Sequence, residues 1–189
     1  MDVFVLRGRQ MVGIGDPDCD FVVYIGNRPP MDEYSQRQGL IPAGKDELAS
    51  IGRETGNHWR KIINIYAKLA YMLDPQGFLT WQAYREGYLL TKGSRQALLF
   101  DDSIYSGVGG KSGGSEAIQL ICGKTHAATL IANGVTDSGV ECSVESSMRW
   151  VDADFAIDPS RRLIVTPYFD YRQLSNAKLE TLVSIINNL

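Results

Sequence analysis

The sequence has little cysteine and little histidine. Its three cysteines, Cys19, Cys122 and Cys142, are odd in number and widely spaced, and none belongs to a CxxC pair. This spacing argues against a structural zinc site and against a small disulfide-stabilised scaffold. The two histidines, His58 and His126, are not accompanied by a GxSxG motif, so hydrolytic triad chemistry has no support and both are predicted to be structural.

Long apolar runs are also missing. The longest, near 21–25 and 163–165, are far shorter than the roughly 20 residues that cross a bilayer. We therefore expect no transmembrane helix and no membrane partner. The first residues, Met1-Asp2-Val3, lack the basic start of a secretory signal, which predicts a cytoplasmic protein.

The sequence has no excess of basic residues. Nineteen Lys and Arg stand against 22 Asp and Glu, which gives a net charge of -3. This balance argues against extended, charge-driven nucleic-acid binding, but it leaves room for a local basic patch. The 189 residues, 44% of them hydrophobic and 22% charged, are typical of one globular domain, and we expect a single α/β domain over residues 1–189.

Three apolar runs have the pattern of strands that are buried on both faces. They span 21–25, 117–122 and 163–165, and each is apolar without alternation and followed by Gly or Pro. A fourth run, at 96–101, predicts a further strand. The segment 27–45 is rich in Pro, Gly and polar residues and predicts a long loop, while 135–160 gives no clear pattern beyond a strand near 140–144.

Segments with the periodicity of helices lie between and after these strands. Apolar residues at helical spacing predict an amphipathic helix over 57–73, and Thr80 is placed to cap a second helix that ends near Tyr88. A helix over 124–133 should end at Gly134, and a C-terminal helix should be capped by Ser175 or Asn176. This order predicts a three-layer α/β/α sandwich with a mainly parallel sheet. Because ligands of such sheets bind outside the carboxyl ends of the strands, function is expected at the loops 27–42, 102–115 and 168–175.

A glycine-rich segment, 103–115, contains the sequence Gly-Val-Gly-Gly-Lys-Ser, which resembles the end of a phosphate-binding P-loop. Tyr105 stands where a P-loop needs its first glycine, and Gly113 and Gly114 disfavour the helix that should follow. The segment is therefore predicted to be a surface loop, with an anion- or nucleotide-binding enzyme as the alternative. The acidic cluster at 16–20 lacks the glycine and the glutamate of a calcium loop. The acidic residues at 101–102 and 152–154 are oxygen ligands that magnesium could use, but such pairs are more often solvated faces or helix caps, so no metal and no cofactor are expected.

Three segments resemble motifs of the uracil-DNA glycosylase superfamily. They are 20–30, a strand that ends in Gly-Asn-Arg-Pro; 118–127, a strand followed by Gly-Lys-Thr-His-Ala; and 163–172, a strand that ends in Thr-Pro-Tyr. The resemblance implies that family's fold, with Arg28 and Thr166 at the places of its water-positioning and leaving-group residues. Arg28 cannot act as a general base, because a guanidinium stays protonated. Asn27, one place earlier, is the conceivable substitute.

The resemblance and the strand ends together predict a ligand cleft. Arg28 is expected at its mouth, paired with Asp32, Asp170 or an external anion, and the mixture of aromatic and arginine side chains suits a nucleobase with its phosphate. We therefore expect a binding or accessory protein on a glycosylase-like scaffold with a nucleotide- or nucleic-acid-derived ligand; a diverged DNA glycosylase is the alternative. The predicted ligand-binding residues are Gly26, Asn27, Arg28, Pro29, Asp32, Thr166, Pro167, Tyr168, Asp170, Tyr171 and Arg172.

Overall fold

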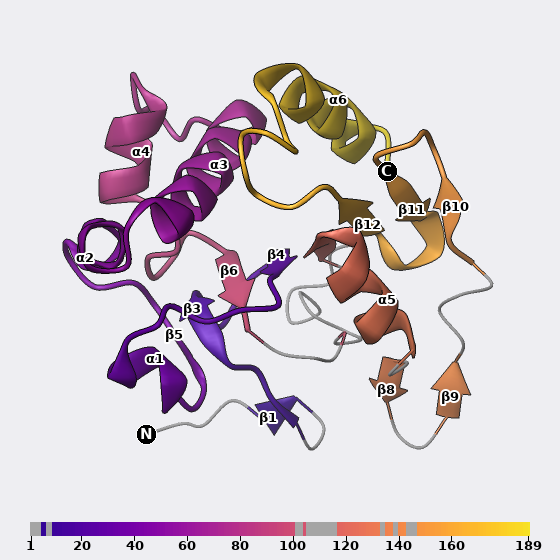
Figure 1. Cartoon of the computed structure of the whole chain (residues 1–189), viewed down its shortest axis with the longest axis horizontal. Helices are drawn as coiled ribbons and strands as arrows, with labels where there is room; N and C mark the ends of the chain where they lie inside the picture. Colours follow the sequence, from indigo (N-terminus) through magenta and orange to yellow (C-terminus); the bar gives the residue numbers. More distant parts are fainter. Residues whose placement is uncertain are drawn as a thin grey trace.

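The computed structural model describes residues 5–6, 9–100, 104, 117–132, 135–137, 140–142 and 147–189 (Figure 1). Within these residues the chain forms an α/β fold around an eight-stranded sheet with the strand order β10-β11-β12-β7-β4-β6-β3-β5. The four central strands run parallel to one another. They are β12 (Leu163–Thr166), β7 (Ile118–Cys122), β4 (Phe21–Tyr24) and β6 (Gln96–Leu99).

These four strands confirm the predictions from the apolar runs. β4, β7 and β12 are neighbours, and almost every side chain in them is buried. Burial on both faces explains why their sequences show no alternation of polar and apolar residues.

The margins of the sheet are partly antiparallel, so the sheet is mixed. β3 (Gly13–Gly15) pairs antiparallel with β6 and parallel with β5 (Leu40–Ile41). On the other side, β11 (Ala156–Asp158) pairs antiparallel with both β12 and β10 (Arg149–Trp150). Two further antiparallel pairs lie outside this sheet, β1 (Val5–Leu6) with β2 (Arg9–Gln10) and β8 (Val135–Asp137) with β9 (Val140–Cys142).

The predicted helices are confirmed where the structure describes them. α3 has the bounds that periodicity indicates. The predicted caps are also present. Thr80 Oγ1 accepts from the Ala83 amide at 3.2 Å at the start of α4, and Ser175 Oγ accepts from the Lys178 amide at 3.4 Å at the start of α6. Gly134, the expected end of α5, lies outside the described residues. The helices are α1 (Asp32–Ser35), α2 (Glu47–Glu54), α3 (Asn57–Leu73), α4 (Trp81–Gly87), α5 (Lys124–Ala132) and α6 (Asn176–Asn187), with a 3₁₀ turn at Pro159–Arg161.

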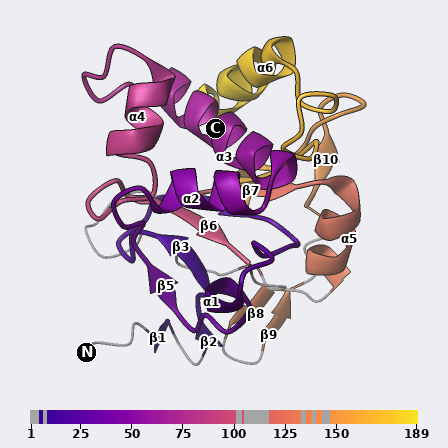
Figure 2. The ribbon, with the colours of Figure 1, turned by 60° about the vertical axis from the view of Figure 1, so that its left-hand side comes forward.

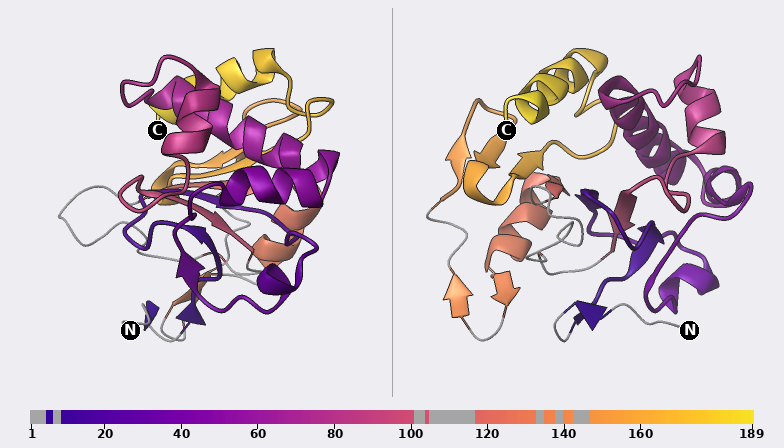
Figure 3. Two further views of the ribbon diagram at one scale, coloured as in Figure 1. Left: turned by 90° about the vertical axis from the view of Figure 1, so that its left-hand side faces the viewer. Right: turned by 180° about the vertical axis from the view of Figure 1, so that it is seen from behind.

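Two hydrophobic clusters cover opposite faces of the sheet. Val23 and its neighbours on one face pack with the buried sides of α2, α3, α4 and α6. Val22 and Tyr24, which alternate with Val23, pack on the other face with Ala127 and Leu130 of α5. Figure 2 and the left panel of Figure 3 show α3 and α6 on one side of the strands and α5 on the other.

One loop prediction needs correction. The segment 27–45 is not a plain excursion, since it contains α1 and the edge strand β5. The segment 135–160, which gave no clear pattern, holds β8, β10 and β11, and the strand expected near 140–144 is the shorter β9. The glycine-rich segment 103–115 lies outside the described residues except for Ile104, which is buried. No helix in the described part of the chain combines the length and the apolar character that crossing a membrane requires.

Candidate ligand-binding cleft

A cleft of about 900 Å³ opens at the carboxyl ends of β4, β7 and β12. The carboxyl edge of a parallel sheet is where ligands of α/β proteins bind, because the loops that leave the strands converge there. The wall of the cleft comes from the residues that follow each strand, from α5 and from the start of α6. It consists of Gly26, Asn27, Cys122, Gly123, Lys124, Thr125, His126, Thr129, Asp154, Pro167, Tyr168, Arg172, Gln173 and Lys178.

Asn27, His58 and Tyr168 form a triangle of polar atoms at this edge. Asn27 Nδ2 lies 3.0 Å from His58 Nε2 and 3.0 Å from the Tyr168 hydroxyl, which itself lies 3.1 Å from His58 Nε2. The rings of His58 and Tyr168 stack with their centroids 5.7 Å apart and an interplanar angle of 23°. Because an amide nitrogen only donates, His58 Nε2 is the acceptor in its contact with Asn27.

Two glycines let rings approach the ends of the strands. Gly123, which follows β7, has φ +89°, and a Cβ there would lie 3.4 Å from Cδ2 of Tyr168. A Cβ on Gly26 would lie 2.9 Å from Nδ1 of His126. Gly26 therefore leaves the space that the ring of His126 occupies, and Gly123 is favoured by its positive φ, since a Cβ there would make only an ordinary contact with Tyr168.

Burial sets the protonation states of two groups in the cleft. It raises the pKa of the Tyr168 hydroxyl, with Cys122 and Asp170 adding to the effect, so this hydroxyl both donates and accepts at neutral pH. Burial also raises the pKa of the Cys122 thiol. Because the thiolate is the nucleophilic form of cysteine, Cys122 behaves as a small apolar side chain, as its sequence context predicts.

Three cations stand around the cleft, and two of them have partners. Lys178 Nζ lies 2.9 Å from a carboxylate oxygen of Asp154, and Lys124 Nζ donates to the Ala153 carbonyl at 2.5 Å. The guanidinium of Arg172 forms no hydrogen bond or ion pair with any residue that the structure describes. Arg172 is therefore the cation available to an anionic ligand.

The structure brings together only part of the predicted site. Gly26, Asn27, Pro167, Tyr168 and Arg172 line the cleft. The other predicted residues are absent from its wall. They are Arg28, Pro29, Asp32, Thr166, Asp170 and Tyr171.

Each of three residues that lie outside the wall has another contact. Thr166 is fully buried, and its hydroxyl donates to the Pro167 carbonyl at 2.8 Å. Asp170 pairs with Lys61 at 2.8 Å, and this ammonium lowers the pKa of the carboxyl group. The two positions that the family resemblance would make catalytic, Arg28 and Thr166, are both turned to internal partners.

The expected pairing of Arg28 with Asp32 or Asp170 is wrong. Arg28 Nη1 donates to the carbonyl oxygens of Tyr34 at 3.2 Å and Arg37 at 3.4 Å, and its guanidinium lies 6.0 Å from the centre of the Phe100 ring. Among the described residues no carboxylate lies within ion-pair distance of it. The short helix α1 folds the chain back over Arg28, so backbone carbonyls take the place of the expected carboxylate.

Replacing Arg28 by Ala is expected to lower the free energy of unfolding by about 1.5–3 kcal/mol, because two backbone carbonyls lose a charged donor. Urea unfolding followed by circular dichroism measures this change. Arg172→Ala, which removes an exposed arginine without such contacts, serves as the matched control and should unfold at the wild-type urea concentration. Equal stability of the two variants would contradict the bracing role of Arg28.

The structure adds residues that the sequence analysis did not select. His58 and His126, predicted to be structural, both reach the cleft region, His58 through Asn27 and Tyr168 and His126 as part of the wall. For His126 a signal was available, since it stands in the first turn of a helix that follows a strand-ending glycine. No group of three or more His, Cys, Asp or Glu side chains in the described ranges is placed to hold a metal ion.

Comparison with known proteins gives a family for the chain but no function. No curated protein and no solved structure shows significant similarity to it. One family model, described as "Family of unknown function (DUF6942)", matches residues 12–187. The match covers the sheet from β3 to β12, all of α6 and all the residues of the cleft wall. The chain therefore belongs to DUF6942, a family of unknown function.

Proposed function

We propose that the protein is a cytoplasmic binding or accessory protein whose cleft takes a nucleotide- or nucleic-acid-derived ligand. Its scaffold would be a three-layer α/β/α sandwich similar to that of the uracil-DNA glycosylase superfamily. The observation that carries the proposal is the guanidinium of Arg172, which has no partner in the described part of the chain, beside the triangle of Asn27, His58 and Tyr168.

Each part of this arrangement suits one part of a nucleotide. The stacked rings of His58 and Tyr168 offer an aromatic surface. The side-chain oxygen of Asn27 accepts one hydrogen bond from Tyr168 and keeps a second lone pair for a donor on a base edge. Arg172 can form charge-assisted hydrogen bonds with a phosphate, which are stronger than bonds between neutral groups. The cleft volume of about 900 Å³ lies within the usual range for small-molecule sites.

Calorimetric titration with uracil, uridine monophosphate and a short single-stranded oligonucleotide tests the proposal. Arg172→Ala should weaken binding of the two phosphate-bearing ligands by about 10- to 100-fold and leave uracil binding unchanged, because only the phosphate contact is lost. Asn27→Ala should weaken all three. Arg53→Ala removes an exposed arginine away from the cleft and serves as the control. Equal affinities of wild-type protein and Arg172→Ala, or no binding at millimolar ligand, would contradict the proposal.

A diverged DNA glycosylase is the second candidate, and the position of Asn27 favours it. Asn27 lines the cleft where Arg28 does not, and its amide is held by His58 and Tyr168. An amide held in this way is placed to position a water molecule.

Incubation of the protein with uracil- or mispair-containing DNA duplexes tests this candidate. The wild-type protein should then yield abasic sites, and Asn27→Ala should yield none. Absence of abasic sites with wild-type protein would remove this candidate. The use of loop 103–115 by an anion-binding enzyme stays a prediction.

A further inference from the structure

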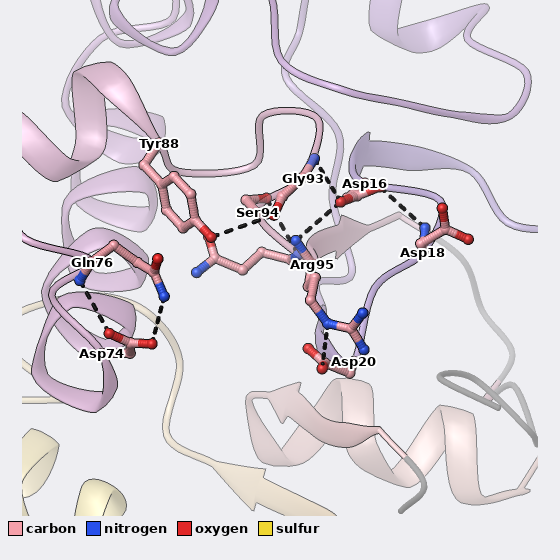
Figure 4. Close-up of polar contacts among 10 residues, drawn as sticks. Asp16, Asp18, Asp20, Asp74, Gln76, Tyr88, Gly93, Ser94 and Arg95 are labelled. Atoms are coloured by element: carbon pink, nitrogen blue, oxygen red, sulfur yellow. Dashed lines mark hydrogen bonds and ion pairs between the residues drawn. The ribbon is translucent and has the colours of Figure 1, made fainter. Parts of the chain in front are cut away.

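A second pocket, of about 540 Å³, lies at the opposite, amino edge of the parallel strands. We call it the amino-edge pocket. Its wall comes from the starts of β4 and β7, the turns before β6 and β12, and the carboxyl ends of α3 and α6. Figure 4 shows polar residues of this region, among them Asp20, Asp74, Gln76, Tyr88 and Arg95.

The pocket holds two arginines and two aspartates, and among the described residues these four side chains form one ion pair. Arg95 Nε donates to Asp20 at 2.7 Å. Arg162 forms no ion pair with any described residue, and its Nε is buried with no hydrogen-bond acceptor among them. Asp74 accepts from the backbone amide of Gln76 at 3.1 Å and from its side chain at 2.5 Å, but it has no cationic partner in the described part of the chain.

The unpaired guanidinium and the unpaired carboxylate do not satisfy each other. Arg162 and Asp74 line the same pocket, yet they lie farther apart than the 4.0 Å limit of an ion pair. A buried donor without an acceptor is costly, so folded proteins rarely retain one that has no use. The buried Nε of Arg162 therefore points to a ligand that supplies an acceptor, and the exposed Asp74 carboxylate on the same pocket wall favours a ligand that also carries a positive charge.

The backbone of the pocket wall is strained at three points. Gln76, Arg95 and Arg162 have φ of +49°, +59° and +49°. They are three of the five non-glycine residues with positive φ in the described ranges. Glycine adopts this conformation without strain, but it cannot supply the guanidinium of Arg162. Residues held in such conformations cluster at functional sites.

The charge pattern selects the ligand. An inorganic anion would meet Arg162 but would be repelled by Asp74, and a simple cation would meet the reverse problem. The carboxyl ends of α3 and α6 add partial negative charge, which favours an ammonium group near Asp74. The half-buried ring of Tyr88 and the buried ring of Tyr84 provide an aromatic wall for the rest of the ligand.

We propose that the amino-edge pocket binds a free amino acid, with its carboxylate on Arg162 and its ammonium on Asp74. The proposal is independent of the cleft at the other edge of the sheet. It makes the protein a two-site molecule, with an amino acid at the amino ends of the strands and the cleft ligand at their carboxyl ends.

Thermal unfolding in the presence of each of the twenty free amino acids, at about 10 mM, tests the proposal, because a ligand that binds only the folded state raises Tm. We expect a subset of the amino acids to raise Tm. The N-acetyl and carboxamide derivatives of the best amino acid should bind at least tenfold more weakly, since each lacks one charge. If none of the twenty raises Tm, or if both derivatives bind as well as the parent, the proposal is overturned.

Variants connect the effect to the pocket. Arg162→Gly should keep or raise Tm without ligand, because it relieves the strained backbone, and it should abolish the shift caused by the amino acid. Asp46→Gly relieves the same conformation, φ +61°, at an exposed site outside the pocket, and should retain the full shift. Asp74→Asn should also lose the shift. A retained shift in Arg162→Gly, or a ligand-free Tm that falls by many degrees in that variant, would show that Arg162 is not a ligand-binding residue.

Discussion

Raising the pH above 10 is expected to unfold the protein, because buried thiol and phenol groups ionise far more easily in the unfolded chain. Burial raises the pKa of Cys19 from 9.0 to about 12 and that of Tyr84 from 10.0 to about 12. It raises the pKa of Cys122, Tyr34 and Tyr66 as well, and in Tyr34 the hydrogen bond to Glu47 adds to the effect. Since the folded state keeps these protons when the unfolded state has lost them, the free energy of unfolding falls as pH rises through the unfolded values.

The expected loss is large. Each group contributes up to about 1.4 kcal/mol per pH unit between its unfolded and its folded pKa, so these groups together lower the free energy of unfolding by several kcal/mol once the pH exceeds their unfolded values. A domain stable by about 5–15 kcal/mol should therefore unfold within about two pH units. Well below pH 9, the unfolded pKa of the cysteines, these groups are protonated in both states and should have no effect.

Urea midpoints measured in steps from neutral pH to pH 12 follow the loss, and ultraviolet absorbance of phenolate reports ionisation in parallel. Return to neutral pH should restore the native circular dichroism. Recovery of the spectrum shows that the unfolding is caused by reversible ionisation and not by chemical modification of the chain. Tyr34→Phe removes one of the groups and should flatten the dependence by about 1.4 kcal/mol per pH unit. A native spectrum at pH 12, together with full phenolate absorbance, would contradict the explanation.

The centre of the fold follows from local sequence because burial acts on every residue there. β4, β7 and β12 are apolar along their whole length, and only a strand covered on both faces requires this. The bounds of α3 can also be predicted from the sequence, since its 17 residues repeat the helical period several times.

The margins of the sheet could not be predicted in this way. β3 contains two glycines and one isoleucine, and β5 and β10 have two residues each, too few to show a period. Such strands exist because a neighbouring strand supplies hydrogen-bond partners, which is information that lies elsewhere in the chain. For the same reason the mixed character of the sheet was not evident from the sequence.

Topology predicts a cleft at the carboxyl ends of the strands, and a pocket lies there, but only some of the predicted residues line it. Asn27, Tyr168 and Arg172 follow directly from the rule that loops at carboxyl strand ends converge. Arg28 was assigned through the family resemblance, and the sequence does not encode that α1 turns its side chain towards two carbonyls. His58 was missed because α3 brings it to the cleft from a different part of the chain.

Two adjacent residues at the start of α3 are expected to separate stability from binding. Trp59 is 2% exposed and meets the Phe100 ring edge-on, with centroids 6.0 Å apart. Trp59→Ala should cost about 3–5 kcal/mol of unfolding free energy, because it leaves a cavity in the core between α3 and the sheet. For a domain of this size that corresponds to a fall in Tm on the order of 10 °C.

His58→Ala is expected to behave in the opposite way. His58 is exposed, and its bonds to Asn27 and Tyr168 are exposed too, so its loss should change stability by less than about 1 kcal/mol. It should nevertheless weaken binding of uridine monophosphate, because the ring that stacks on Tyr168 and the acceptor that orients Asn27 both disappear. Urea unfolding and calorimetric titration of the two variants measure both effects. A destabilised His58→Ala, or unchanged affinity in that variant, would show that the triangle braces the fold and does not form part of the binding surface.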